Sequence, residues 1–242
     1  MSVIAGQPQS VKATRKWVKK NGHTIIKDFA HLLSMPNVAS DKVNIRRNAK
    51  YISNLFKKRG FDMQLLETED ANPIIYGEYK TPGAKRTLCF YVHYDGQPVD
   101  LIQWTHGPFD PVLYDASMDA GGKPIPLPMK QTKIDPEWRL YARSAGDDKA
   151  PIMTILNAVD GLQSSEIGFT SNIKLFFEGE EEAGSTNLEA HLTKHKALLD
   201  DIDIWLFCDG PMHQSRQPQL VFGVRGVTGM EITVYRGDPI FA

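Results

Sequence analysis

The sequence predicts an α/β fold whose central sheet is largely parallel and buried. Segments rich in β-branched and aromatic residues alternate along the chain with segments that carry apolar residues at helical spacing. Three of the predicted strands, around "TLCFYV", "IKLFF" and "IWLFC", are largely apolar, which is typical of strands covered on both faces. No internal repeat or low-complexity segment interrupts this alternation.

Two helices are predicted before the first strand. Residues 24–34 carry apolar side chains at helical spacing, and residues 41–59 carry them on one face. Ser40 or Asp41 can cap the start of the second helix, and Gly60 can end it.

The middle of the chain predicts two strands, a long loop and a helix. "PIIYGEY" at 73–79 and "TLCFYVHYD" at 87–95 have the composition of strands. Residues 97–138 are rich in proline and glycine, which predicts a long loop decorated with short strands. A helix is expected from Pro151 onward, because proline is tolerated in the first helical turn.

The later part of the chain continues the alternation. The strand "NIKLFFEG" at 172–179 precedes a helix expected at 187–199, for which Thr186 and Glu189 form a T-x-x-E capping box. The remaining predicted strands are 202–210, 219–224 and 230–236.

Composition argues for a globular domain and against nucleic-acid or membrane partners. The 242 residues are 41% hydrophobic and 24% charged, with a net charge of −1 and no basic block. No apolar stretch approaches the roughly 20 residues that span a bilayer, and the N-terminal segment lacks the apolar core of a signal peptide. Cys89 and Cys208 lie in apolar runs, which favours buried thiols in a reducing compartment. The expected location is therefore the cytoplasm.

One histidine and a group of carboxylates follow the ends of three predicted strands and precede the start of one helix. In open α/β sheets, ligands bind beyond the carboxyl ends of the strands, so we expect these side chains to converge on one rim. No basic partners are evident among them. The set consists of His93, Asp95, Asp147, Asp148, Glu178, Glu180, Glu181, Glu182 and Asp209.

A histidine among carboxylates is the ligand chemistry of zinc, cobalt or manganese. Like charges at such close spacing stay ionised only when a cation compensates them. Two divalent ions about 3.5–4 Å apart, bridged by a carboxylate and a water, would account for so many acids in one place. A glutamate that binds neither ion could take a proton from that water as a general base.

Four motifs occur in order along the chain: "VHYDGQPVD", "RSAGDDKAP", "EGEEEAGS" and "FCDGP". In this order they resemble the co-catalytic zinc aminopeptidase and carboxypeptidase family of carnosine dipeptidases, glutamate carboxypeptidase, aminoacylase and succinyl-diaminopimelate desuccinylase. The dipeptidase branch is the most similar, and the resemblance extends from about Leu32 to Val234. It implies a zinc-exopeptidase-like, three-layer αβα fold with a mostly parallel central sheet.

The resemblance also implies metal ligands. His93 and Asp209 would bind one ion, Asp147 would bridge both ions, and Glu182 would bind the other. The implied cofactors are two divalent ions, most simply Zn²⁺, with Mn²⁺ or Co²⁺ as alternatives.

The other acids of the rim receive different roles by the same resemblance. Asp95 would orient His93 as a carboxylate behind the ligand, and Glu181 would be the general base. Glu178 and Glu180 match no catalytic position and are expected to be supporting or solvated.

The chain departs from the family pattern in two places. Ala142, Ser144 and Ala150 stand where the family usually has glycines around the bridging aspartate. Family members also continue, after a strand like "MEITVY", into a lid and dimerisation domain, with two later histidines that this chain lacks, one of them a metal ligand. We therefore expect residues 1–228 to be the N-terminal part of the catalytic domain and 229–242 a truncated start of the lid domain. Full-length relatives are expected to be homodimers.

The leading hypothesis is a metal-dependent hydrolase of amide bonds in dipeptides or N-acyl amino acids. Its rival is a catalytically incompetent fragment or a metal-binding scaffold without the lid and the last ligand, and an incomplete gene product is a third possibility. Other hydrolases fit less well, because His191 and His195 lack the glutamate of H-E-x-x-H. No G-x-S-x-G motif indicates a covalent nucleophile, and neither cysteine has a convincing histidine partner.

Overall fold

The computed structural model describes residues 8–210, 212, 213, 215, 217, 219–223, 226 and 230–234. The chain forms two units, Met1–Asp209 and Gly210–Ala242. All helices and strands of the described residues belong to the first unit. The domain boundary expected after residue 228 stays a prediction, because residues 227–229 lie outside the described part.

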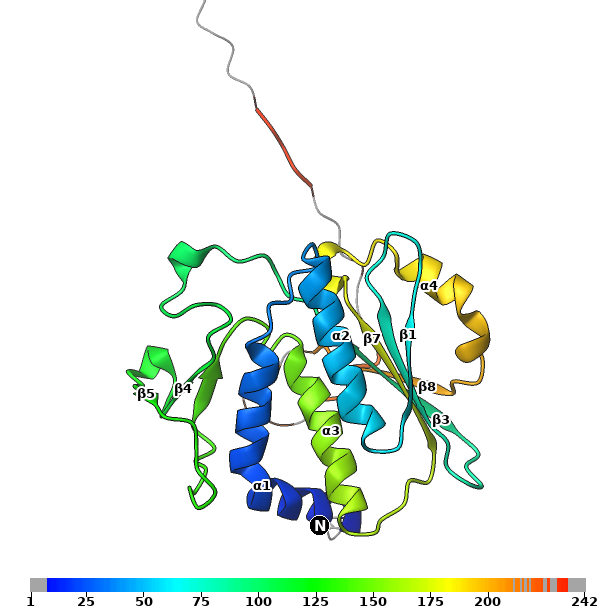
Figure 1. Cartoon of the computed structure of the whole chain (residues 1–242), viewed down its shortest axis with the longest axis horizontal. Helices are drawn as coiled ribbons and strands as arrows, with labels where there is room; N and C mark the ends of the chain where they lie inside the picture. Colours follow the sequence, from blue (N-terminus) through cyan, green and yellow to red (C-terminus); the bar gives the residue numbers. More distant parts are fainter. Residues whose placement is uncertain are drawn as a thin grey trace, which may run out of the picture. The chain divides into compact units, whose positions relative to one another are not determined.

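A five-stranded sheet forms the centre of the first unit (Figure 1). Its strands are β1 (Asp62–Leu66), β2 (Ile74–Tyr79), β3 (Thr87–His93), β7 (Asn172–Glu178) and β8 (Ile204–Phe207). They lie in the order β1-β2-β7-β3-β8. β3 pairs in parallel with β7 and β8, whereas β2 is antiparallel to β1 and β7. Every strand except β2 therefore runs in one direction, which confirms the mostly parallel sheet.

Helices cover both faces of this sheet and complete three layers. α1 (Gln9–Leu33), α2 (Lys42–Lys57) and α3 (Lys149–Gln163) lie over one face, as Figure 1 shows. α4 (Leu188–Lys194) and the turn after it cover the other face. The αβα architecture expected from the resemblance is thus confirmed.

Alternate residues of the strands fill two separate cores. On β3, Val92 packs beneath α2 and α3, while Cys89 and Tyr91 point to the opposite face. On β7, Phe177 lies in the same core as Val92, and Phe176 lies in the same core as Cys89 and Tyr91. Because successive side chains of a strand point to opposite faces, an apolar strand such as β3 or β7 needs cover on both sides.

Helix α1 begins at Gln9, well before the helix expected at 24–34. Its first half is too polar to show an apolar stripe, and it is held by contacts with α3. The indole Nε1 of Trp17 donates to Asn157 Oδ1 at 3.3 Å. A Cβ on Gly161 would lie 2.8 Å from the Cα of Thr14, so only glycine allows the two helices this approach.

Helix α2 agrees with its prediction. Asp41 rather than Ser40 caps it, since the Asp41 carboxylate accepts the backbone N–H of Asn44 at 3.1 Å. Gly60 follows the helix with a φ of 88°, a conformation that favours glycine.

Helix α4 corrects its prediction. It ends at Lys194, and a separate 3₁₀ turn follows at Lys196–Leu198. The expected capping box is wrong: Asn187 occupies the N-cap position, and no side-chain hydrogen bond caps the helix. The Asn187 amide donates to Glu180 Oε2 at 2.8 Å instead, because that buried carboxylate competes for it.

One edge strand of the sheet was not predicted, and two predicted strands do not form. β1 was not predicted, because its five residues are mixed in polarity and bury only Leu66. The expected strands at 219–224 and 230–236 are wrong wherever the structure describes them: residues 219–223 and 230–234 belong to no strand. Their apolar side chains, Phe222 and Val234 among them, are exposed. Apolar alternation alone does not form a strand, because a strand also needs a partner.

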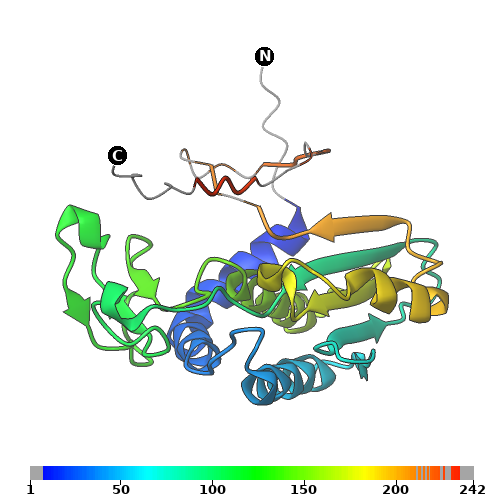
Figure 2. The same cartoon turned by 90° about the horizontal axis from the view of Figure 1, so that it is seen from above.

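The long segment after β3 carries small elements, as expected. β4 (Val112–Tyr114) pairs in antiparallel fashion with β5 (Pro124–Ile125) and β6 (Arg139–Tyr141). Figure 2 shows this three-stranded sheet to one side of the central sheet, beyond α1.

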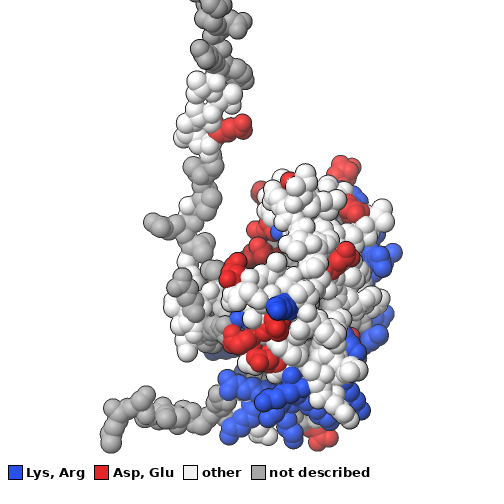
Figure 3. All heavy atoms as spheres, turned by 90° about the vertical axis from the view of Figure 1, so that its left-hand side faces the viewer, with Lys and Arg blue, Asp and Glu red and all other residues white. Residues whose placement is uncertain are grey.

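The described surface has one concentration of positive charge that the net charge did not predict. Figure 3 shows Lys and Arg side chains gathered at one end of a face of the first unit. The first half of α1 exposes Lys12, Arg15, Lys16, Lys19 and Lys20. Among the described residues, no helix is both long and apolar enough to cross a membrane.

Candidate metal centre

The strand order explains why the predicted residues meet. His93 is the last residue of β3 and pairs in register with Glu178, the last residue of β7. Asp209 follows β8, the other neighbour of β3, and Asp147 and Asp148 precede α3. Because parallel strands present their carboxyl ends on one rim, the acids arrive around His93 from both sides.

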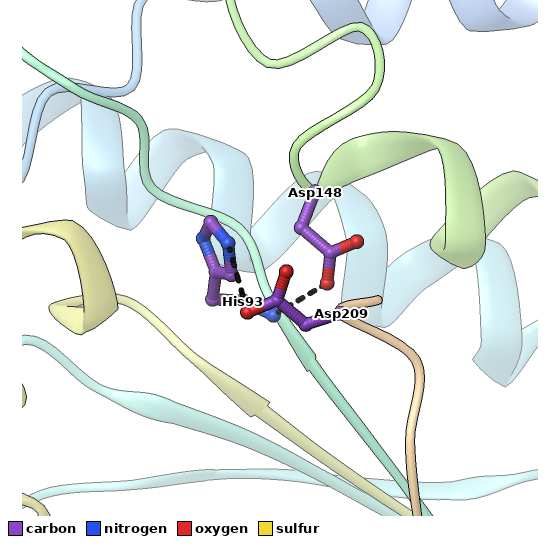
Figure 4. A group of neighbouring side chains, drawn as sticks. All are labelled: His93, Asp148 and Asp209. Carbon is purple, nitrogen blue, oxygen red and sulfur yellow. Dashed lines mark hydrogen bonds and ion pairs between the residues drawn. The ribbon is translucent and has the colours of Figure 1, made fainter. Parts of the chain in front are cut away.

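His93 is completely buried at the centre of this rim. Its Nε2 atom lies 2.7 Å from Asp147 Oδ1, 3.8 Å from Asp209 Oδ2 and 3.9 Å from Glu181 Oε2. Figure 4 shows the Asp209 carboxylate next to the His93 ring and the Asp148 carboxylate directed at the His93 backbone N–H. The structure thus places one imidazole within reach of several carboxylates.

Two overlapping groups of side chains have the geometry to hold a metal ion. One consists of His93, Asp147 and Glu182, and the other of His93, Asp148 and Asp209; within each group the ligand atoms lie within 4.8 Å of one another. The four predicted ligands all belong to these groups. Asp148 is an addition that the sequence did not single out as a ligand.

Asp148 is buried and holds the backbone of His93. Its Oδ2 accepts the His93 N–H at 3.2 Å, and burial raises the pKa of this carboxyl to about 8. Only its adjacency to Asp147 in "GDDK" pointed to it. A residue that fixes the main chain of a ligand cannot be recognised from spacing alone.

Asp95 is buried and contacts three parts of the centre. Its Oδ1 lies 3.4 Å from His93 Nδ1, the geometry of an orienting carboxylate. Its two oxygens also accept the backbone N–H groups of Glu181 and Glu182 at 3.2 and 3.1 Å. The sequence suggested the contact with His93 but not the contact with the glutamate loop.

The glutamate cluster separates into buried and accessible members. Glu178 accepts the Tyr91 hydroxyl at 2.5 Å, and burial raises its pKa. Glu180 accepts the Asn72 N–H at 2.7 Å. Both are therefore supporting rather than solvated. Glu181 and Glu182 are only partly buried and face the centre.

Gln97 is a further residue of the rim that the sequence did not assign. Its side-chain amide donates to Oε2 of Glu182, one of the predicted metal ligands. Its place in the "HYDGQP" motif was the indication of a role.

The carboxylates around His93 are suited to a divalent cation. Within the described part of the chain, no lysine or arginine forms an ion pair with Asp95, Asp147, Glu181 or Asp209. Burial lowers the pKa of His93, but the Asp95 carboxylate, 3.4 Å from its Nδ1, and other nearby acids raise it to about 10. A buried imidazole among carboxylate oxygens fits zinc or a similar ion.

The histidines of α4 and the two cysteines do not have the features of a second catalytic site. His191 is buried, with Nδ1 2.9 Å from the Thr68 hydroxyl and Nε2 3.1 Å from the Asn72 carbonyl oxygen, so both nitrogens are occupied. Burial raises the pKa of Cys89 to about 12 and that of Cys208 to about 11. Neither thiol is ionised near neutral pH, as a nucleophile would need to be.

The family model for the peptidase family M20/M25/M40 matches residues 89–239, which include every side chain of the centre. The chain belongs to this family. The resemblance noted from the four motifs is thereby confirmed.

Relatives place this M20 chain near dipeptidases. It is 26% identical over 238 residues to the Cys-Gly metallodipeptidase dug1 of Schizosaccharomyces pombe, covering 90% of this chain and 44% of the relative. It is 32% identical over 171 residues to human Beta-Ala-His dipeptidase, covering 70% of this chain and 29% of the relative. The chain thus spans less than half the length of these relatives.

Solved M20 structures share the fold. Human carnosine dipeptidase 1 superposes with a TM-score of 0.66 at 22% identity, over 85% of this chain and 42% of that chain.

Proposed function

We propose that this chain forms the metal-binding part of a metal-dependent hydrolase that cleaves amide bonds in dipeptides or N-acyl amino acids. The observation that carries the proposal is the surroundings of His93, where three carboxylate oxygens lie within 3.9 Å of Nε2. The dipeptidases among the M20 relatives support the substrate class.

Four side chains would hold the ions. As the resemblance implies, His93, Asp147 and Asp209 would bind one ion, and Asp147 with Glu182 would bind a second. The ligand atoms that lie within 4.8 Å of one another form slightly different groups, in which Asp209 lies with His93 and Asp148, and Glu182 with His93 and Asp147. Zinc suits this donor set, with manganese or cobalt as alternatives. Ions held there supply a Lewis acid for the carbonyl oxygen and make a bound water more acidic.

Glu181 is the residue that we assign as general base. Its side chain is 36% exposed, its Oε2 lies 3.9 Å from His93 Nε2, and burial raises its pKa. A carboxylate that is reachable from solvent and more basic than usual can take a proton from the attacking water and pass it to the leaving amine. Asp95 holds the Glu181 backbone at the rim, and so keeps the base in reach of the reacting water.

The second candidate is a metal-binding chain without turnover. One observation favours it: if His93 binds the same ion as Asp209, only Asp147 and Glu182 of the group around Asp147 are left for the other ion. Catalytic zinc usually has three protein ligands.

Zinc content and hydrolysis of a dipeptide panel that includes Cys-Gly and β-Ala-His distinguish the two candidates. The hydrolase predicts about two zinc ions per chain together with turnover. Zinc binding without turnover of any dipeptide would instead support the scaffold.

The general base is tested by Glu181→Gln in the same zinc-loaded chain. We expect kcat to fall by about 10²- to 10⁴-fold, since the amide cannot accept the proton, while zinc content stays unchanged. Glu189→Gln is the matched control, because Glu189 is exposed on α4. Wild-type turnover in the Glu181 variant would rule out the base assignment.

A further inference from the structure

The residues that join α1 to α2 lie against both segments that carry metal ligands. We call this segment, residues 34–41, the connector. At its centre Asn37 is completely buried, and its carbonyl oxygen accepts the N–H of Gly96 at 2.9 Å. Val38 forms a parallel bridge with the same glycine. The connector therefore runs beside the turn that follows His93 and contains Asp95.

The Asn37 side chain joins this turn to the loop before α3. Its Nδ2 donates to the Tyr94 carbonyl oxygen at 2.8 Å and to Ser144 Oγ at 3.0 Å. Tyr94 lies between His93 and Asp95 in the sequence, and Ser144 is three residues before Asp147. One buried amide thus spans the two backbone segments whose side chains face each other at 2.7 Å in the centre.

The fit around Asn37 is close. A Cβ on Gly96 would lie 2.3 Å from Ser144 Oγ, so the strand end and the loop before α3 are already in contact there. The Oδ1 atom of Asn37 is buried with no partner among the described residues. A buried amide whose oxygen has no hydrogen-bond partner lowers the stability of the fold. This cost indicates that Asn37 has a role other than stabilising the fold.

Lys149 forms a second link between the connector and the centre. It is completely buried directly after Asp148, and its Nζ donates to the carbonyl oxygens of Leu32 and Met35 at 3.0 and 3.1 Å. Leu32 is in the last turn of α1, where the helix dipole favours a cation, and Met35 belongs to the connector. Its own N–H donates to the Ser144 carbonyl oxygen at 3.1 Å. The loop that carries Asp147 is therefore fixed at both of its ends.

We propose that Asn37 is a positioning residue for the metal centre. It sets the separation of His93 and Asp147, and with it the affinity for the ion, without touching ion or substrate. Lys149 supports the same loop from the end of α1. This inference rests on the proposed function in one respect only, namely that the centre binds a divalent ion.

Zinc affinity, measured by competition with a chromophoric chelator, tests the inference. We expect Asn37→Ala to weaken zinc binding by about 10- to 100-fold, the range for residues that orient metal ligands. Asn157→Ala is the matched control: Asn157 is also buried and makes two hydrogen bonds, from its Nδ2 to the Met153 carbonyl oxygen and from Trp17 Nε1 to its Oδ1, and neither partner belongs to the connector. It should change zinc affinity by less than about twofold, although both variants lose stability to urea.

Ser144→Ala provides a milder variant in case Asn37→Ala does not fold. It removes one of the two Asn37 bonds, and we expect zinc binding to weaken by about 2- to 10-fold. Unchanged affinity in this variant, or equal affinities in the two asparagine variants, would overturn the positioning role. A wild-type chain that binds zinc but hydrolyses nothing would overturn the hydrolase and leave the inference standing. A wild-type chain that binds no zinc would overturn both.

Discussion

Asp95 accepts the backbone N–H groups of two consecutive glutamates while its carboxylate faces the ring of His93. A carboxylate used in this way is not free to bind an ion. The same is true of Glu178 and Glu180, which accept hydrogen bonds from Tyr91 and Asn72. The acidic rim therefore divides into groups that hold the protein together and groups that face the centre.

Gly179 lies between the two buried glutamates, Glu178 and Glu180, and makes a testable contact. A Cβ at this position would lie 2.5 Å from the Tyr94 hydroxyl oxygen, and Tyr94 is buried and donates to the Pro73 carbonyl oxygen. We expect Gly179→Ala to lower the free energy of unfolding in urea by about 1–3 kcal/mol through overpacking. Gly168→Ala is the control, since nothing lies within 4 Å of its Cβ position. Equal stability of the two variants would contradict the contact.

At the residue scale, the sequence predicts those site residues that lie at the end of a predicted strand. His93 and Asp209 each end an apolar run, so their meeting follows from a parallel sheet. Asp148 and Asn37 could not be predicted in their roles, because each acts on the backbone of a segment far away in the chain. Such contacts depend on how layers pack, which no local pattern records.

At the scale of elements, α2 shows how one cap adds to stability. The side-chain and backbone N–H groups of Asn44 donate to the Asp41 carboxylate and lower its pKa. A pKa that is lower in the folded state means that the ionised cap stabilises the protein above the ordinary pKa of about 3.9. The stabilisation is lost as the pH falls through the lowered value.

Asp41→Ala should therefore lower the free energy of unfolding by about 0.5–2 kcal/mol near pH 7, and by less near pH 3. Thermal or urea unfolding at the two pH values measures the difference. Asp41→Asn is the control, because its amide oxygen keeps an acceptor for Asn44 but loses the titration. A loss in Asp41→Ala that does not change with pH would contradict this account of the cap.

The elements that sequence predicted are those whose own residues specify them. α2 carries a cap and β3 and β7 carry largely apolar runs, and all three form where expected. The first half of α1 was not predicted, because contacts with α3 stabilise it rather than a pattern in its own sequence. The reversed direction of β2 could not be predicted either, because a strand sequence does not encode the direction of its neighbour.

At the scale of the whole first unit, β8 is an edge of the central sheet. It pairs with β3 on one side, and within the described residues no strand pairs with its other side. Phe207 on this strand is 69% exposed. Under α3, on the other face of the sheet from Phe207, lies an apolar cavity of about 460 Å³, lined by Phe90, Leu162 and Cys208 among others. An open edge next to exposed apolar surface favours association between chains.

We therefore expect the chain to self-associate as its concentration rises, and Phe207→Lys to reduce this association. Sedimentation velocity over a concentration series measures the effect. Val43→Lys is the matched control, because Val43 is 80% exposed on α2, away from the sheet edge. A wild-type chain that stays monomeric throughout, or an equal effect of both variants, would show that the edge is not the cause.

The central position of β3 also has a consequence during synthesis. Both of its partners, β7 and β8, lie later in the chain, so β3 leaves the ribosome with two unpaired edges. About 80 residues separate β3 from β7, and at roughly 5–20 residues per second they take about 4–16 seconds to translate. During that interval β3, which ends in His93, is an apolar strand that α1 and α2 can cover on only one face. In this interval the nascent chain can bind chaperones or form wrong strand pairs, and the carboxylates of the centre cannot yet come together around an ion.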